Sequence, residues 1–113
     1  MIDWNHLSNE EHIHQIIQDS FQAPQLIFKH STRCGTSAMA LGRLERQWNS
    51  AINPVKLYFL DLLSYRNVSN CVAETFDVEH QSPQVLLIQN GKCTYTTSHN
   101  DISISGFSGI ISQ

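Results

Sequence analysis

The sequence has no run of lysine or arginine residues, and its formal net charge is −3. A basic surface that would bind nucleic acid or an anionic membrane is therefore not expected. The apolar runs are only a few residues long, whereas a membrane-spanning helix needs about 20 apolar residues. The first residues also lack the basic start and apolar core of a secretory signal, so we expect a cytoplasmic protein with no membrane partner.

Cysteine is scarce as well. The chain has three cysteines, an odd number that does not suggest a framework of disulfide bonds. In a reducing compartment a reactive cysteine is catalytic or sensing more often than structural. His12 and His14 lie two residues apart and would point to different sides of a helix, so we expect no metal site from them. A length of 113 residues suits one domain, residues 1–113, with one hydrophobic core.

Residues 29–37, K-H-S-T-R-C-G-T-S, are the most informative stretch. They follow a short apolar run and precede a helix-like segment, residues 38–48, so Cys34 is expected at a strand-to-helix junction. The unpaired N–H groups and the dipole at the start of a helix stabilise a thiolate, and Arg33 would act in the same direction. With Ser37 on the same helical face, the pattern is C-x-x-S, the one-thiol form of the C-x-x-C redox motif. A buried structural cysteine is the alternative, and the local motif leaves both open.

Hydrophobic periodicity predicts the other elements. A short first strand is expected within residues 4–7, and the capping-box pattern of Ser8 and Glu11 predicts the start of the first helix. Ser31 or Thr32 is expected to cap the second helix. The remaining elements are, in chain order, a first helix ending before Pro24, a strand over 25–30, a helix over 38–48, a strand over 55–60, a helix over 63–77, strands over 84–88 and 92–97, and a last helix over 102–112.

These elements predict an α/β fold. The helix–turn–strand connections predict β-α-β units with right-handed crossovers and parallel strands. Asn90-Gly91 is a signal for a two-residue type I′ turn, so the last two strands form an antiparallel hairpin. On that hairpin Cys93 is expected to share a face with Tyr95, whereas Cys71 is expected on the core face of the third helix. The prediction is a central mixed sheet flanked by helices on both faces.

This order of elements, with C-x-x-S ahead of the second helix and Ser82-Pro83 ahead of the hairpin, resembles the thioredoxin fold. In that fold the proline peptide bond is cis and the proline faces the active cysteine. The resemblance therefore implies a cis bond at Ser82-Pro83. The local sequence alone would not, because only ~5–6% of X-Pro bonds are cis.

The resemblance extends to one family. Residues 28–37 are similar to the K-H-S-x-x-C-P-I-S motif of the YtxJ-like monothiol bacilliredoxins. The H-x-S-P-Q, N-G and H-x-D-I elements of that family have counterparts in residues 78–84, 90–91 and 98–102. One departure matters: the family has proline and isoleucine where this chain has Gly35 and Thr36, so the redox poise cannot simply be carried over.

The activity that the resemblance implies is thiol–disulfide exchange. The Cys34 thiolate would attack the sulfur of a small-thiol cap, bacillithiol in this family, on a client protein. The client would leave as a free thiol, and a second small thiol would release the cap from Cys34, because Ser37 cannot resolve the mixed disulfide. The implied partners are thiol-capped client proteins and a small thiol, with bacillithiol as co-substrate. We expect no tightly bound cofactor, and a monomer or a weak dimer.

Further site residues follow from the same resemblance. Ser37 would donate a hydrogen bond to the Cys34 sulfur, and Ser82 would offer its backbone N–H and C=O to an extended substrate beside Pro83. His30 would either pair with the Cys34 thiolate or be a buried histidine. Three residues are expected either to border the site and hold the acidic groups of the cap or to be solvated surface residues: Lys29, Arg33 and Thr36.

Three other functions stay open. Residues 34–37, C-G-T-S, differ by one residue from the C-G-F-S motif of monothiol glutaredoxins, which bind an iron–sulfur cluster between two protomers. The G-G-x-D segment of that family is replaced here by S-H-N-D, residues 98–101. The chain could also be an interaction module without catalysis, since a fold does not imply a function. Finally, Cys71 or Cys93 could act as a resolving thiol if its Cα lay within about 7 Å of that of Cys34.

Overall fold

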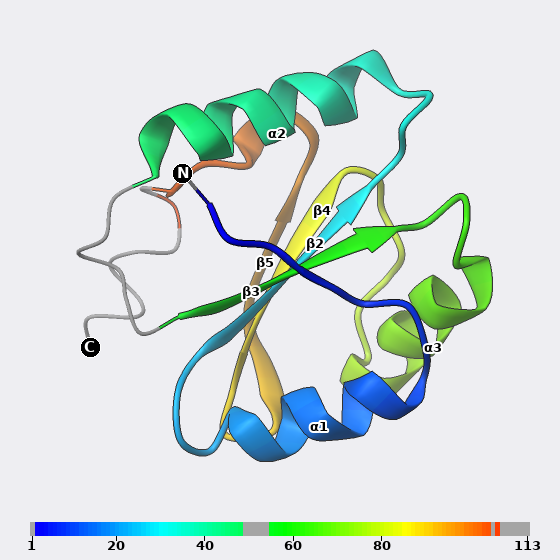
Figure 1. Cartoon of the computed structure of the whole chain (residues 1–113), viewed down its shortest axis with the longest axis vertical. Helices are drawn as coiled ribbons and strands as arrows, with labels where there is room; N and C mark the ends of the chain where they lie inside the picture. Colours follow the sequence, from blue (N-terminus) through cyan, green and yellow to red (C-terminus); the bar gives the residue numbers. More distant parts are fainter. Residues whose placement is uncertain (1, 49–54, 105, 107–113) are drawn as a thin grey trace.

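The computed structural model describes residues 2–48, 55–104 and 106. A five-stranded mixed sheet with the strand order β1-β3-β2-β4-β5 forms the centre of the molecule (Figure 1). Strands β1, β2 and β3 are parallel, and β4 is antiparallel to both β2 and β5. The strands are β1 (Asn5–His6), β2 (Gln25–His30), β3 (Lys56–Asp61), β4 (Gln84–Gln89) and β5 (Lys92–Ser98).

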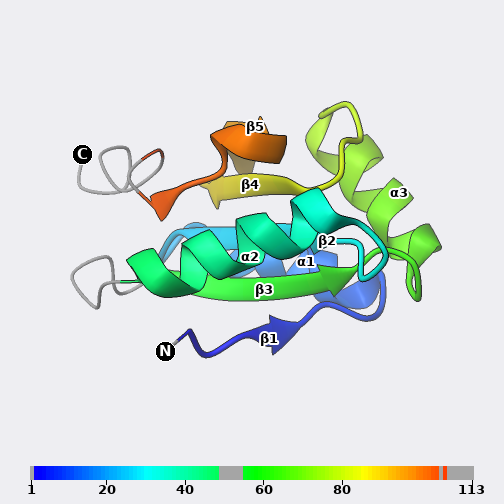
Figure 2. The same ribbon diagram turned by 90° about the horizontal axis from the view of Figure 1, so that it is seen from above.

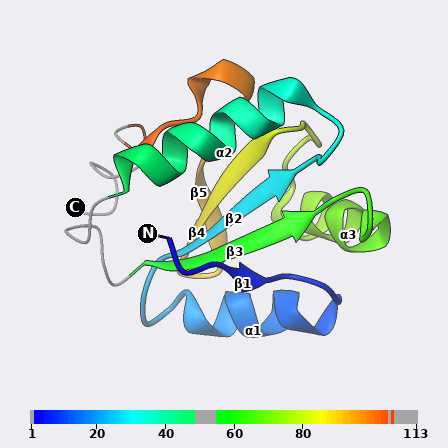
Figure 3. The same ribbon diagram turned by 45° about the horizontal axis from the view of Figure 1, so that its top comes forward.

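Helices cover both faces of this sheet (Figures 2 and 3). Helix α2 (Gly35–Gln47) lies on one face, and α1 (Glu11–Asp19) and α3 (Arg66–Phe76) lie on the other. A short 3-10 helix, η2 (His99–Asp101), follows β5 and lies next to α2. There the Arg43 guanidinium donates to the carbonyl oxygens of His99 and Ile102. The predicted α/β architecture and the short first strand are both confirmed.

The hydrophobic core has two parts, one on each face of the sheet. Strand β2 is central and buried along its whole length. Its successive side chains enter opposite parts of the core, as the two-residue period of a strand requires. Phe28 packs with Leu44 of α2, whereas Ile27 packs with Ile16 of α1 and Val72 of α3. The position of a residue along β2 therefore decides which helices its side chain meets.

The first helix begins differently from the prediction. Helix α1 begins at Glu11, and Glu10, its N-cap residue, makes no side-chain capping bond. Instead, Asn9 Oδ1 accepts the His12 N–H at 3.0 Å. The predicted capping box of Ser8 and Glu11 is therefore not formed, because Asn9, one residue nearer to the helix, supplies the acceptor.

The second helix begins at Gly35, earlier than the predicted residue 38. Its N-cap residue is Cys34, so neither Ser31 nor Thr32 caps it, and the capping prediction is wrong. The physical reason is a turn over residues 31–34, in which the Cys34 N–H donates to the Ser31 carbonyl oxygen at 3.2 Å. This turn separates Ser31 from the first helical turn.

A β-bulge overturns the prediction that Cys93 and Tyr95 share a face. The pairing of β5 with β4 shifts by one residue at Thr94. This residue lies between Cys93 and Tyr95 and has no opposite residue on β4. An extra residue in one strand reverses the alternation of sides beyond it. Cys93 consequently packs on the α1 and α3 side, and Tyr95 packs on the α2 side. The turn before it has positive φ at Asn90 and Gly91, 53° and 79°, as a type I′ turn requires.

The predicted last helix, residues 102–112, lies mostly outside the described residues. What the structure describes just before it is η2, which the sequence patterns did not predict. Ile102 and Ile104 are buried in the part of the core beneath α2. The chain beyond β5 therefore returns to the α2 side of the sheet.

Candidate active site at the start of helix α2

Cys34 lies where β2 leads into α2. As the N-cap residue of α2 it has an extended backbone, with φ −109° and ψ 119°, and its thiol is free and partly exposed. Its carbonyl oxygen accepts the Ala38 N–H at 3.1 Å, the first bond of the helix. The free N–H groups and the positive end of the helix dipole lie at an N-cap. Cys34 therefore stands at the end of α2 that favours negatively charged groups.

The turn at Ser82-Pro83 lies at the same edge of the sheet. Lys29 of β2 pairs with Gln84 of antiparallel β4, so the residues after Lys29 and those before Gln84 emerge side by side. The Ser82-Pro83 peptide bond is cis, as the resemblance to the thioredoxin fold implies. Within the described ranges the Ser82 hydroxyl oxygen is buried and without a hydrogen-bond partner. The pairing of β2 with β4 thus brings the cysteine loop and the cis-proline turn together.

Ser37 is fully buried, and its hydroxyl is engaged within the protein. The oxygen lies 2.6 Å from His30 Nδ1 and accepts the Ser31 N–H at 3.0 Å. Among the hydrogen bonds of the described residues, none joins Ser37 to the Cys34 sulfur. The predicted bond between them is replaced because the Ser37 side chain turns toward the sheet, where His30 ends β2.

His30 is placed as a buried histidine. It is 6% exposed, and the centroid of its ring lies 5.7 Å from that of Phe28 and 5.2 Å from that of Phe59. Burial lowers the pKa of His30, and the nearby Asp61 carboxylate offsets this only in part. The neutral ring is therefore favoured near neutral pH, and its Nδ1 can accept the proton of the Ser37 hydroxyl.

Lys29 does not border the Cys34 site, so the prediction that it holds the acidic groups of the cap is wrong. Its side chain is fully buried on the α3 side, because consecutive residues of a strand point to opposite faces. The Lys29 Nζ donates to the Ser69 carbonyl oxygen at 3.1 Å and lies 3.2 Å from His80 Nδ1. The ammonium group is therefore bound on the side of the sheet away from α2.

The surface on either side of Cys34 is open. Arg33, the preceding residue, is exposed, and Thr36 is partly exposed in the first turn of α2. Gly35 is also exposed, and a methyl group on it would meet no atom within 4 Å. Arg33 and Thr36 thus stand at the border of the site, and their role toward a ligand stays a prediction.

Sequence reasoning did not place three residues of this region in the site: His80, Gln84 and His99. The His99 N–H donates to the Pro83 carbonyl oxygen at 3.0 Å. Gln84 is buried, and its amide donates to the Glu79 carbonyl oxygen at 3.0 Å and accepts the Gln81 N–H at 3.3 Å. His80 and Gln84 belong to the H-x-S-P-Q element, and His99 belongs to the H-x-D-I element. Their membership in these motifs is the sequence signal that could have identified them as site residues.

Cys71 and Cys93 lie on the other side of the sheet from α2. Cys93 is in register with the beginning of β2, about 16 Å from the end that leads to Cys34, at ~3.3 Å per residue. Because a disulfide needs Cα atoms within about 7 Å, Cys93 cannot resolve a disulfide at Cys34 in this fold. Burial also raises the pKa of Cys93, which lowers its thiolate fraction near neutral pH.

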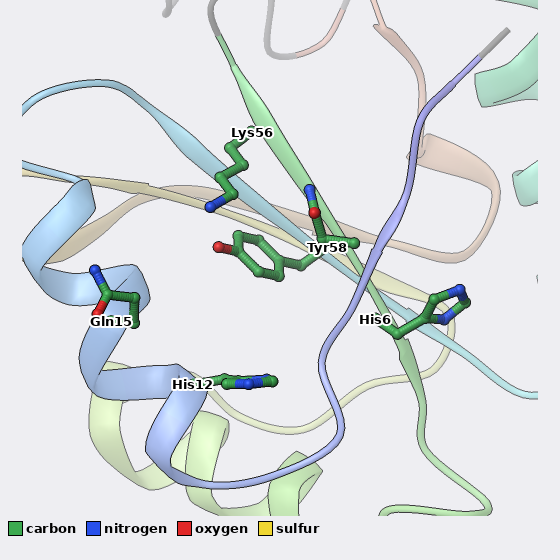
Figure 4. A pocket seen from close by; sticks show the side chains of 6 residues that line it. His6, His12, Gln15, Lys56 and Tyr58 are labelled. Carbon is green, nitrogen blue, oxygen red and sulfur yellow. The ribbon is translucent and has the colours of Figure 1, made fainter.

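A groove of about 270 Å³ lies on the α1 side, where His12 and Gln15 of α1 face Lys56 and Tyr58 of β3 (Figure 4). Several of its polar groups are already paired. The Lys56 Nζ lies 3.8 Å from one carboxylate oxygen of Asp19, and the other accepts the Gln15 amide at 2.8 Å. This groove is on the opposite face from α2, and we do not assign it to the site.

The described part of the chain contains neither a metal-binding cluster nor a membrane-spanning helix. No group of three or more His, Cys, Asp or Glu side chains is arranged to hold a metal ion in residues 2–48, 55–104 and 106. Over those same residues, no helix has the length and apolar character needed to cross a bilayer.

The fold and the site define the class of the protein: a thiol–disulfide oxidoreductase with a thioredoxin fold. A solved structure described as a putative oxidoreductase with a thioredoxin fold is 26% identical, with 92% of this chain and 89% of that chain covered and a TM-score of 0.78. Thioredoxin from Malassezia sympodialis is 19% identical over 98% of this chain and 90% of that chain, with a TM-score of 0.75. Mitochondrial thioredoxin 3 from Saccharomyces cerevisiae is 16% identical over 96% and 93%, with a TM-score of 0.72. At such identities the last two likenesses show the fold alone.

The chain belongs to the monothiol bacilliredoxin family. Residues 5–106 match the model of the family described as Monothiol bacilliredoxin BrxC. This match includes Cys34, the cis-proline turn and the hairpin, and it confirms the resemblance seen in the sequence. The protein is therefore a thiol redox protein of the thioredoxin-like superfamily.

Proposed function

We propose that this protein removes a bacillithiol cap from cysteines of client proteins, with Cys34 as the attacking thiol. The observation that carries the proposal is the place of Cys34. It is a free, partly exposed thiol at the N-cap of α2, at the sheet edge that also carries the cis-proline turn. Ser37 stands where a second cysteine would resolve the disulfide, so the cycle needs a thiol from solution.

The proposed reaction consists of two exchanges. The Cys34 thiolate attacks the sulfur of the cap, the disulfide between client and cap breaks, and the client cysteine leaves as a thiolate that takes a proton from water. Cys34 is then joined to the cap. The thiolate of a second bacillithiol attacks the cap sulfur, Cys34 leaves as a thiolate, and oxidised bacillithiol is released. Each exchange breaks one disulfide and forms one, so the second thiol is the only reductant required.

The surroundings of Cys34 suit a bulky disulfide. The open space at Gly35 leaves room beside the sulfur. Arg33 and Thr36 border that space, and a guanidinium forms strong hydrogen bonds with carboxylates, which would hold the acidic groups of the cap. Ser82, ahead of the cis bond, would present its backbone groups to an extended client segment, as in strand addition. The client would thus lie along the turn and the cap along the start of α2.

Intact mass spectrometry tests the proposal. The protein would be exposed to oxidised bacillithiol, and then to reduced bacillithiol, alongside Cys34→Ser, Cys71→Ser and Cys93→Ser variants. We expect one bacillithiol adduct on the wild type and on the Cys71 and Cys93 variants, no adduct on the Cys34 variant, and loss of the adduct after the second thiol is added. A client protein that carries one bacillithiol cap should lose that cap when it is mixed with the wild type, and should keep it when it is mixed with the Cys34→Ser variant.

Two results would contradict the proposal. If Cys34 gains the adduct no faster than Cys71 or Cys93, it is not the reactive thiol. If the adduct forms but a capped client keeps its cap, the protein reacts with the small thiol without acting on clients. In either case an interaction module or a cluster carrier becomes the better description.

A further inference from the structure

Lys29 is a buried cation without a carboxylate partner in the described part of the chain. Its side chain is 0% exposed, and its Nζ contacts the Ser69 carbonyl oxygen and His80 Nδ1, at 3.1 and 3.2 Å. Taking an ammonium group out of water costs free energy that hydrogen bonds to neutral groups return only in part. A methionine of similar length would fill the same space without that cost. Stability therefore does not account for a lysine at this position.

His80 connects this lysine to the turn beside Cys34. It lies between α3 and β4, two residues before the cis peptide bond. Its two neighbours in the chain are held by Gln84, whose side-chain amide contacts the Glu79 carbonyl oxygen and the Gln81 N–H. The backbone on both sides of His80 is thus hydrogen-bonded to Gln84 of β4, and the His80 ring is hydrogen-bonded to Lys29 of β2. The segment that leads into the cis-proline turn is held from two strands.

While Lys29 is charged, the hydrogen bond between Lys29 Nζ and His80 Nδ1 can form in only one protonation state of His80. An ammonium group has three donors and no acceptor, so His80 Nδ1 must accept and the ring must be neutral. His80 is exposed as a residue, and the partial desolvation of its ring, followed by the charges of Lys29 from β2 and Arg66 from α3, lowers its pKa. Among the hydrogen bonds within the described residues, the same nitrogen also contacts the Ser69 hydroxyl at 3.4 Å. Protonation of His80 would place two cations against each other and open the contact.

We propose that Lys29 and His80 form a positioning pair, whose hydrogen bond holds the cis-proline turn in the place where a client protein docks beside Cys34. The inference rests on the proposed function, but it concerns how the client is bound and not which thiol attacks. Lys29 lies on the far side of the sheet from α2 and touches no substrate, so it acts through the turn alone. The pair therefore affects the affinity for a protein substrate and leaves the reaction of Cys34 with a small reagent unchanged.

Three variants separate positioning from packing. His80→Leu removes the acceptor and Lys29→Met removes the donor, whereas His80→Asn keeps an acceptor oxygen near the place of Nδ1 but cannot be protonated. His14→Leu, which changes an exposed histidine of α1, is the matched control. For each protein we would measure kcat and KM with a bacillithiol-capped client between about pH 5 and 8. We would also measure the alkylation rate of Cys34 by iodoacetamide and the hydrogen exchange of the backbone amides within residues 79–84, where Pro83 alone has no N–H.

We expect His80→Leu and Lys29→Met to raise KM for the client about tenfold, as the loss of one hydrogen bond to a charged group predicts. Their kcat and alkylation rates should stay near those of the wild type, and the amides of residues 79–84 should exchange faster. Acidification should raise KM of the wild type as His80 gains a proton. His80→Asn should keep the low KM and lose this pH dependence, and His14→Leu should behave as the wild type.

Two results would overturn the proposal: unchanged KM and exchange in His80→Leu, or a parallel fall of kcat and alkylation rate, which would indicate general damage to the fold. If the wild type does not act on the capped client, the proposed function fails, and the exchange measurement still decides about the pair. In that case positioning requires faster exchange of residues 79–84 in His80→Leu and wild-type exchange in His80→Asn.

Discussion

Two neighbouring residues at the end of β2, Lys29 and His30, hold different parts of the site. Their side chains point to opposite faces because a strand has a two-residue period. His30 contacts Ser37 in the first turn of the helix that Cys34 caps, and Lys29 contacts His80 ahead of the cis-proline turn. At the scale of single residues, one strand end therefore contacts both the first turn of the helix that Cys34 caps and the segment ahead of the cis-proline turn.

The contact between Ser37 and His30 leads to a prediction about stability. We expect Ser37→Ala to lower the free energy of unfolding by about 1–3 kcal/mol, because the buried Ser31 N–H and His30 Nδ1 lose their partner. Urea denaturation would measure it, with Thr32→Ala, an exposed neighbour, as the control that changes little. If both substitutions change the free energy of unfolding equally and by little, the hydroxyl of Ser37 does not stabilise the loop.

The buried lysine predicts an unusual pH dependence of stability. Burial lowers the pKa of Lys29 from 10.5 to about 8. Between these two values the unfolded chain binds more protons than the folded one, so the free energy of unfolding should rise with pH across this window. The full shift corresponds to roughly 3 kcal/mol.

Urea denaturation at several pH values across that window would measure the contribution of Lys29. We expect the free energy of unfolding of Lys29→Met to rise less with pH than that of the wild type. Lys92→Met, which removes an exposed lysine, should show the same rise as the wild type. A rise of the same size in Lys29→Met would show that the Lys29 ammonium is better solvated than its burial indicates.

At the scale of elements, the start of α2 is built to accept a proline after Cys34. Cys34 has the extended conformation that a residue before proline prefers, and the added carbon atoms have open space at Gly35. Proline is favoured at the first helical position because the N–H there has no partner within the helix. We expect Gly35→Pro to raise the free energy of unfolding by about 0.4–1 kcal/mol through a stiffer unfolded chain.

Chemical denaturation would measure this, and Gly42→Pro is a useful contrast. Gly42 lies inside α2, where proline removes a helical hydrogen bond and should lower the free energy of unfolding by about 3 kcal/mol. If Gly35→Pro also destabilises the protein by that amount, the helix does not begin at Gly35.

The bulge in β5 is the second feature at this scale that has a measurable consequence. It turns Cys93 to the α1 and α3 side, where burial raises the pKa of its thiol. We expect iodoacetamide to modify Cys93 slowly at neutral pH in the folded protein and much faster after unfolding in urea. Peptide mapping would measure both rates, and equal rates would mean that the Cys93 thiol is open to solvent.

At the scale of the whole molecule, the sheet separates Cys34 from the other two cysteines, which lie on the α1 and α3 side. An iron–sulfur cluster at Cys34 would therefore need ligands from a second protomer or from small thiols. We expect the protein, purified without air, to be colourless and to run as a monomer or a weak dimer. Visible absorbance combined with light scattering after size-exclusion chromatography would test this, and a coloured dimer would favour the cluster carrier.

Much of the fold could be predicted because its signals are local. The strand over 25–30 matches its prediction residue for residue, and β4 begins at Gln84, directly after Pro83, as predicted. Cys34 was predicted at the strand-to-helix junction for the same reason. The partners of Lys29, in contrast, are 40 and 51 residues away in the chain, and no local pattern identifies them. The bulge at Thr94 was missed because its sequence keeps the composition of an ordinary strand.

The order of the described strands and helices, the position of Cys34 at the strand-to-helix junction and the family could all be inferred from the sequence, because apolar periodicity, turn residues and motifs are properties of neighbouring residues. The partners of the motif side chains became clear from the tertiary structure alone. It turned Ser37 to His30 instead of Cys34, and it buried Lys29 against His80 on the opposite face. The physical reason is that each side chain bonds to whatever group the pairing of β2 with β4 and the packing of the helices bring to its face of the sheet.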